Sequence, residues 1–128
     1  MSTVLVIEDD ISLRALVSLV LEMHGYRVQT AENGLDGLDH IAATMPDLIL
    51  LDMRMPVMSG AEFAAEYQAR YRDTTRAPII VVTAAEHAAR KAQEVGANGF
   101  LAKPFSNTEL VRAVEKHVGA TVAAVTPS

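Results

Sequence analysis

Short apolar runs alternate with longer amphipathic segments five times along this chain, and this alternation restricts the possible folds more than any other feature. Two runs, Leu48–Leu51 and Ile79–Val82, are continuously apolar, as expected of central parallel strands that are buried on both faces. Five strand–helix units predict an α/β fold with a parallel sheet, helices on both faces and right-handed crossovers. The predicted strands are Val4–Ile7, Tyr26–Thr30, Leu48–Leu51, Ile79–Val82 and Phe100–Leu101.

Five helices are predicted between and after these strands. The first, Ile11–His24, ends before Gly25, a residue suited to the left-handed conformation that terminates helices. Its apolar residues at helical spacing, which we expect to face the core, are Leu13, Leu16, Val17, Val20 and Leu21. The other helices are predicted at Leu35–Thr44, Ala61–Arg72, Glu86–Val95 and Asn107–Val118, the last opened by Ser106 or Asn107 with Glu109 following.

Composition excludes several classes of function. The 128 residues fit one domain, which we place at residues 1–118, with 119–128 as a flexible tail or the start of a linker. A net charge of -5 argues against direct nucleic-acid binding, and the absence of Cys excludes disulfides and thiol metal sites. With no leader-like N-terminus and no run near the roughly 20 apolar residues that span a membrane, we expect a cytoplasmic domain without membrane contact.

Polar residues follow four of the predicted strands. Three consecutive acidic residues, Glu8–Asp10, follow the first strand, Asp52 follows the third and Thr83 the fourth, while Lys103 and Pro104 follow the fifth. Ligands of open α/β sheets bind beyond the carboxyl ends of the strands. We therefore expect these side chains to share one site.

Each polar residue also has a purely structural interpretation. One acidic residue after the first strand could cap a helix, and Asp52 could cap the turn that begins at Met53. Thr83 could open a helix with Glu86 three residues on, and Lys103 could simply pair with a carboxylate. Their coincidence at one edge of one sheet favours a shared site.

The residue types at this edge suit a hard cation and a phosphoryl group. Carboxylate oxygens without soft ligands favour Mg²⁺, which uses one or two carboxylates together with a phosphate. Without a cation the carboxylates would repel one another and raise some of their pKa values. With that charge neutralised, Asp52 can act as a nucleophile and form an acyl phosphate, while Lys103 balances charge on the phosphoryl group.

Over residues 3–118 the sequence resembles the receiver domain of two-component response regulators. The resemblance is carried by Val-Leu-Val-Ile-Glu-Asp-Asp at 4–10, Leu-Leu-Asp-Met-Arg-Met-Pro at 50–56 with Ser59-Gly60, Val82-Thr83-Ala84, and Gly-Phe-Leu-Ala-Lys-Pro-Phe at 99–105. All four motifs in this order and at this spacing are specific. The resemblance implies a doubly wound, flavodoxin-like sheet of five parallel strands in the order 2-1-3-4-5, with five helices on both faces.

The resemblance assigns roles to these residues. It implies that Asp52 accepts a phosphoryl group and binds Mg²⁺, for which Mn²⁺ can substitute. Asp9 would bind the metal directly, Glu8 through a water or by its charge, and Arg54 through its backbone carbonyl. The other implied roles are phosphoryl contacts from Lys103, Thr83 and Ala84, a switch formed by Thr83 and Phe100, and a cis peptide bond between Lys103 and Pro104.

The implied partners are a sensor histidine kinase or a histidine phosphotransfer protein upstream, and a target or fused effector downstream. The domain would be a switch that changes the surface of its last helices and strand. It would not be an enzyme, because it would catalyse only its own phosphorylation and slow dephosphorylation. Phe100 stands where Tyr is more usual in the family. Arg54, two residues after the acceptor, is hypothesised to cover the acyl phosphate and prolong its life.

Three alternatives compete with this interpretation. Aspartyl-phosphate hydrolases carry an Asp-x-Asp motif whose second Asp is the general acid, but the residue two after Asp52 is Arg54. A degenerate receiver acting as a constitutive interaction domain is disfavoured because all the switch residues are present. A flavin-binding domain of similar fold is disfavoured because the chain has three Tyr, three Phe and no Trp for stacking.

Overall fold

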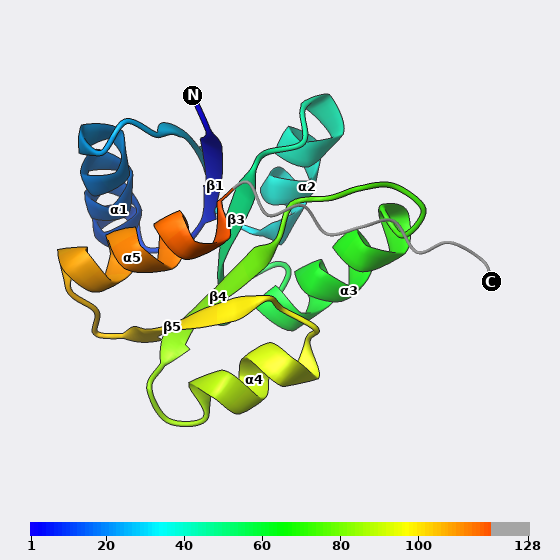
Figure 1. Cartoon of the computed structure of the whole chain (residues 1–128). Coiled ribbons are helices and arrows are strands. Elements are labelled where there is room, and N and C mark those ends of the chain that lie inside the picture. The colour runs from blue at the N-terminus through cyan, green and yellow to red at the C-terminus, as the bar shows by residue number, and fades with distance from the viewer. Residues whose placement is uncertain (119–128) are drawn as a thin grey trace.

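The predicted alternation forms a five-stranded parallel sheet in the computed structural model, which describes residues 1–118. The strand order is β2-β1-β3-β4-β5 (Figure 1), which confirms the doubly wound α/β fold and the order 2-1-3-4-5. The proposed tail at 119–128 lies outside the described residues. The strands are β1 (Thr3–Ile7), β2 (Arg27–Ala31), β3 (Leu48–Asp52), β4 (Ile79–Ala84) and β5 (Gly99–Lys103).

Five helices cover the two faces of the sheet, with α1 and α5 on one side and α2, α3 and α4 on the other (Figure 1). Alternate residues of a strand point to opposite faces, so Leu5 and Ile7 pack under α2 and α3 while Val4 and Val6 pack under α1 and α5. The helices are α1 (Ile11–Met23), α2 (Gly34–Ala43), α3 (Gly60–Arg70), α4 (Ala88–Glu94) and α5 (Asn107–His117). Among residues 1–118 no helix is long and apolar enough to cross a membrane.

Strand β3 lies at the centre of the sheet. All five of its residues are buried, as its continuous apolar sequence predicts, and it pairs in parallel with both β1 and β4. Its last residue, Asp52, is opposite Val82 of β4. A carboxylate is therefore held at the end of the most buried strand of the fold.

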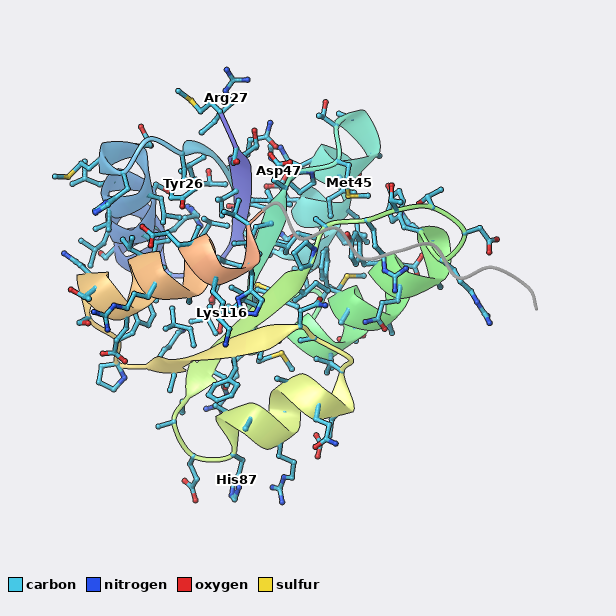
Figure 2. The ribbon with its side chains drawn as sticks, viewed as in Figure 1. Tyr26, Arg27, Met45, Asp47, His87 and Lys116 are labelled. Carbon is cyan, nitrogen blue, oxygen red and sulfur yellow. The ribbon has the colours of Figure 1, made fainter. Side chains whose placement is uncertain are left out.

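Strand β5 and helix α4 differ from the sequence predictions. The ladder between β4 and β5 continues to Ala84 and Lys103, so β5 is longer than its apolar run. Thr83 belongs to β4, and the idea that it opens the next helix with Glu86 is wrong. The N-cap of α4 is His87, which has a left-handed backbone, makes no side-chain capping bond and points away from the sheet in Figure 2.

Helix α1 buries a narrower strip than its sequence suggests. Val17, Val20 and Leu21 are buried, but Leu16 is 49% exposed, so the expectation that it faces the core is wrong. Leu16 lies at the edge of the strip that the sheet and α5 can cover, and Leu19 lies further outside at 57% exposed. Gly25, with φ 89, ends the helix as predicted.

The loop between β3 and α3 holds a β-branched residue in a costly conformation. Val57 has φ 71, where such side chains are strained, and it is 72% exposed. Because Asn tolerates the left-handed region, we expect Val57→Asn to raise the unfolding free energy by about 1 kcal/mol. Urea denaturation measures it. Val57→Ile keeps the branched side chain and serves as the control; an equal gain in that variant would contradict the explanation.

Candidate functional site

The carboxyl ends of β1, β3, β4 and β5, together with the residues that follow β1 and β3, surround an open hollow of about 340 Å³. The parallel arrangement of the strands places these ends at one edge of the sheet. The hollow is lined by Glu8, Asp9, Asp10, Asp52, Arg54, Thr83, Ala84 and Lys103. The structure therefore brings together every site residue singled out from the sequence except Phe100 and Pro104.

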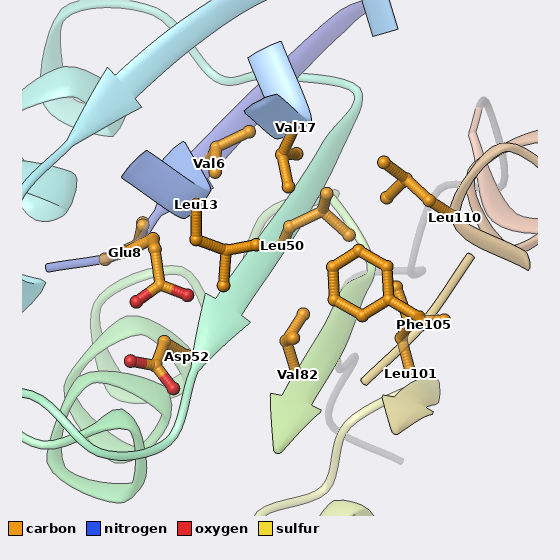
Figure 3. A pocket seen from close by; sticks show the side chains of 11 residues that line it. Val6, Glu8, Leu13, Val17, Leu50, Asp52, Val82, Leu101, Phe105 and Leu110 are labelled. Atoms are coloured by element: carbon orange, nitrogen blue, oxygen red, sulfur yellow. The ribbon is translucent and has the colours of Figure 1, made fainter. Parts of the chain in front are cut away.

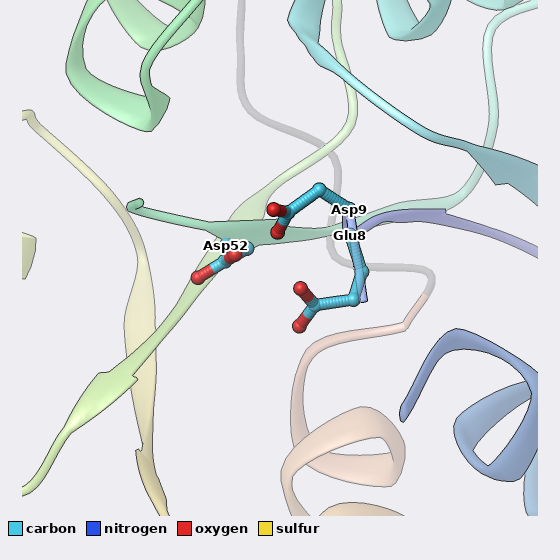
Figure 4. Close-up of side chains that lie close together, drawn as sticks. All are labelled: Glu8, Asp9 and Asp52. Atoms are coloured by element: carbon cyan, nitrogen blue, oxygen red, sulfur yellow. The ribbon is translucent and has the colours of Figure 1, made fainter. Parts of the chain in front are cut away.

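Three carboxylates form the centre of the site. Glu8, Asp9 and Asp52 each offer one oxygen, and these oxygens lie within 4.8 Å of one another. Figure 4 shows the three side chains close together. Glu8 and Asp52 are 4% and 5% exposed, whereas Asp9 is exposed. The donor set contains hard oxygen ligands and no sulfur, which fits Mg²⁺.

Lys103 is the cation that touches both buried carboxylates. Its Nζ donates to Glu8 Oε1 at 3.2 Å and to Asp52 Oδ1 at 3.4 Å. Burial acts to lower the pKa of Lys103, but the carboxylates of Asp52 and Glu8 outweigh that effect and raise it. Lys103 thus stays an ammonium group at the centre of the site.

One ammonium group does not balance the acidic charge. Burial, and then the hydrogen bond with Asp52 and its negative charge, raise the pKa of Glu8 to about 7. The burial arises because the Glu8 and Asp52 carboxylates stand at one end of an apolar cavity (Figure 3). Its other lining residues are Val6, Ile7, Leu13, Val17, Leu50, Val82, Leu101, Phe105 and Leu110. Either a proton on Glu8 or a bound cation relieves the repulsion.

The structural interpretations of Asp10 and Asp52 also hold, as does the pairing of Lys103 with a carboxylate. Asp10 caps α1 by accepting a hydrogen bond from the Leu13 N–H at 3.0 Å. The Arg54 N–H donates to Asp52 Oδ1 at 3.3 Å, so Asp52 does stabilise the following turn. This bond uses one of the two Asp52 oxygens and orients the carboxylate, and the Arg54 side chain lies exposed at the rim of the hollow.

The two proposed switch residues lie apart. Thr83 is 3% exposed and lines the hollow, whereas Phe100 is 47% exposed and lines a separate groove with residues of α4 and α5. Phe100 stands opposite Val81 in the β4–β5 ladder, two positions before the pair Thr83 and Ala102. The peptide bond between Lys103 and Pro104, beyond this strand, is cis.

Two cations at the site were missed by sequence reasoning. Arg14 of α1 donates from Nη1 to the Glu8 backbone carbonyl at 2.7 Å, and Lys91 of α4 donates from Nζ to Thr83 Oγ1 at 3.5 Å. Neither belongs to a strand end, which is where the sequence pattern predicts the site residues. Arg14 lies one helical turn after the Asp10 cap, and that spacing is the signal that points it back toward the strand end.

Known proteins resemble this chain in sequence and in architecture. The family model of the response regulator receiver domain matches residues 4–115. The phosphate regulon regulatory protein PhoB of Pseudomonas aeruginosa is 40% identical over 111 residues, which cover 85% of this chain and 48% of PhoB. The CpxR homolog of Haemophilus influenzae is 35% identical, with 90% and 49% covered. This chain thus spans about half the length of these relatives.

Solved structures agree. The Vibrio cholerae chemotaxis regulator CheY4 superimposes with a TM-score of 0.81 at 34% identity, over 92% of this chain and 99% of CheY4. The Thermotoga maritima regulator TrrA, solved in complex with Mg²⁺ and BeF, also gives 0.81 at 34% identity, over 92% of this chain and 100% of TrrA.

Fold and site together define a phosphorylatable switch domain, the module that receives the signal in two-component systems. The chain belongs to the response regulator receiver domain family. TrrA was solved with Mg²⁺, and in this chain the donor set of Glu8, Asp9 and Asp52 fits the same ion.

The raised pKa of Glu8 makes metal-free stability depend on pH. A carboxyl whose pKa is raised by folding stabilises the protein most below its ordinary value near 4.5, and loses that contribution as pH rises through about 7. Glu8→Gln stays neutral throughout. We therefore expect the variant to gain about 2 kcal/mol in unfolding free energy relative to the wild type between pH 5 and pH 8. Denaturation in EDTA measures the gap, and a gap that stays constant with pH would refute the coupling.

Proposed function

We propose that Asp52 is the phosphate acceptor of this domain and that Mg²⁺ assists the transfer. The observation that carries the proposal is the convergence of three carboxylate oxygens within 4.8 Å beside an ammonium group. Asp9 and Asp52 would hold the metal, Glu8 would act through a water or its charge, and the Arg54 carbonyl would complete the protein ligands. Mn²⁺ is expected to substitute. The metal supplies charge neutralisation for the phosphoryl oxygens.

The chemistry of the chain's own residues follows from their positions. An oxygen of Asp52 attacks the phosphorus of a phosphohistidine, the phosphorus–nitrogen bond breaks, and an acyl phosphate forms on Asp52. The freed imidazole of the donor takes up the electron pair of that bond and is protonated. Lys103 already lies 3.4 Å from Asp52, so it can shift from the carboxylate to a phosphoryl oxygen. The Thr83 hydroxyl and the Ala84 N–H are the proposed donors to the other oxygens.

The proposed signal leaves the domain through β5 and its neighbouring helices. Thr83 would move toward the phosphoryl group, and the exposed Phe100 ring would turn inward into the space vacated, which alters the surface formed by α4, β5 and α5. This is a two-state element biased by a local change in charge. Because Phe lacks the hydroxyl of Tyr, the outward rotamer of Phe100 gains no polar contact.

The proposed surroundings of the domain follow from its family. The phosphoryl donor is a sensor histidine kinase or a histidine phosphotransfer protein, and the output is a separate target or a fused effector. Residues 1–118 form the receiver unit, located in the cytoplasm without direct contact to nucleic acid or membrane. It is a switch that turns over only its own acyl phosphate, because position 54 holds Arg where a hydrolase needs a second Asp.

Replacement of the acceptor tests the proposal. Incubation with Mg²⁺ and acetyl phosphate is expected to add one acid-labile phosphoryl group to the wild type and none to Asp52→Asn, because an amide is not a competent nucleophile. Intact-protein mass spectrometry measures the adduct. Asp73→Asn, at an exposed loop position, is the matched control. If Asp52→Asn still gains the phosphoryl group, Asp52 is not the acceptor. Turnover of added phosphate monoesters would instead favour a hydrolase.

Arg54 is proposed to shield the acyl phosphate. Arg54 is exposed and lines the hollow two residues after Asp52, so its long cationic side chain can lie across the phosphoryl group and keep water away. We expect Arg54→Ala to lose phosphate roughly fivefold faster, which corresponds to about 1 kcal/mol of protection. The decay of the phosphorylated mass after removal of the donor measures the rate. Unchanged or slower decay would reject the shielding role.

A further inference from the structure

The Arg14 side chain forms a hydrogen bond with a backbone carbonyl at the site, and not with a side chain. Its Nη1 donates to the carbonyl oxygen of Glu8 at 2.7 Å, and the contact is partly buried. That carbonyl belongs to the peptide group that joins Glu8 to Asp9. Among residues 1–118 no carboxylate lies within ion-pair distance of Arg14. The guanidinium group is therefore committed to the main chain and not to the charge of the cluster.

The turn after β1 is anchored on both sides of Asp9. On one side the Glu8 N–H donates to the Ala31 carbonyl at 3.0 Å, continuing the pairing of β1 with β2. On the other side the Asp10 N–H donates to Glu8 Oε2 at 3.3 Å, and the Asp10 side chain caps α1. The Glu8–Asp9 peptide lies between these anchors, and Arg14 holds its carbonyl.

Asp9 is the member of the cluster that depends most on this turn. Glu8 and Asp52 are fixed by burial and by Lys103, but the Asp9 carboxylate is exposed. The peptide planes on either side of Cα set the direction of the Cα–Cβ bond, and the backbone also limits which side-chain rotamers are allowed. A fixed Glu8–Asp9 peptide therefore keeps the Asp9 Cα–Cβ bond in an orientation from which its carboxylate reaches the other two oxygens.

We propose that Arg14 is a positioning residue for the divalent cation, acting through the Glu8–Asp9 peptide. The inference rests on the proposed function, in which Asp9 binds Mg²⁺. It makes a prediction opposite in sign to simple electrostatics. Removing a positive charge near an acidic site should strengthen binding of a cation, whereas releasing the peptide should weaken it, because groups that orient metal ligands contribute strongly to metal affinity.

Calorimetric titration of the whole chain with MgCl₂ at pH 8 tests the inference. We expect Arg14→Met to bind Mg²⁺ about tenfold more weakly than the wild type. Arg14→Lys, which can still donate one hydrogen bond, should fall between them. Arg112→Met removes the same charge from an exposed position on α5 and should bind like the wild type. Asp9→Asn reports on the ligand itself and should bind most weakly.

The outcomes separate the inference from the function on which it rests. If the wild type binds Mg²⁺ and Asp9→Asn does not, but Arg14→Met binds as tightly as the wild type or more tightly, the positioning role is wrong. The same holds if Arg14→Met loses stability to urea in EDTA without losing affinity for Mg²⁺. If Asp9→Asn matches the wild type, the proposed metal site itself fails. Should Arg14→Met not fold, Arg14→Ala, which also lacks the donor, takes its place, and wild-type affinity for Mg²⁺ in that variant overturns the inference.

Discussion

Two buried carboxylates, Glu8 and Asp52, share one ammonium group from Lys103. The rest of the site depends on the resulting excess of negative charge. Lys103 Nζ lies 3.2 Å from Glu8 and 3.4 Å from Asp52, but one Lys cannot offset the negative charge of both. Asp9 adds a third carboxylate, whose oxygen lies within 4.8 Å of the other two. The protein meets the imbalance by raising the pKa of Glu8. A bound cation would offset the excess negative charge directly, whereas the proposed phosphoryl group would add negative charge that the cation and Lys103 would have to neutralise.

The fold supplies this arrangement through strand direction. Parallel strands bring the ends of β1, β3 and β5 to one edge, so residues far apart in sequence meet without a long loop. The apolar cavity behind Glu8 and Asp52 keeps water from one side of both carboxylates, which strengthens their repulsion. The same central burial that stabilises the sheet thus creates the electrostatic tension at its edge. Stability and function here use the same strands.

Much of the fold and of the candidate site could be predicted from the sequence, because buried parallel strands have continuous apolar sequences. The strand order and the gathering of Glu8, Asp9, Asp52, Thr83 and Lys103 at one edge follow from that pattern and from the family motifs. The rest could not be predicted, because it depends on tertiary contacts. Leu16 has an apolar side chain but lies at the edge of the strip that the sheet and α5 can cover. The pairing of β4 with β5 continues through Ala102 and Lys103, past the apolar run Phe100–Leu101. Arg14 donates to a backbone carbonyl, a contact that the periodicity of the sequence does not reveal.

In the proposed function, Asp52 accepts a phosphoryl group in a site completed by a divalent cation. A crystal structure of this protein grown with Mg²⁺ and beryllofluoride would show both ligands at once. We expect a beryllofluoride group on an oxygen of Asp52, Mg²⁺ in contact with Asp9 and Asp52, and Lys103 turned toward a fluorine. A site with beryllofluoride absent from Asp52, or with the metal bound away from Asp9, would contradict it.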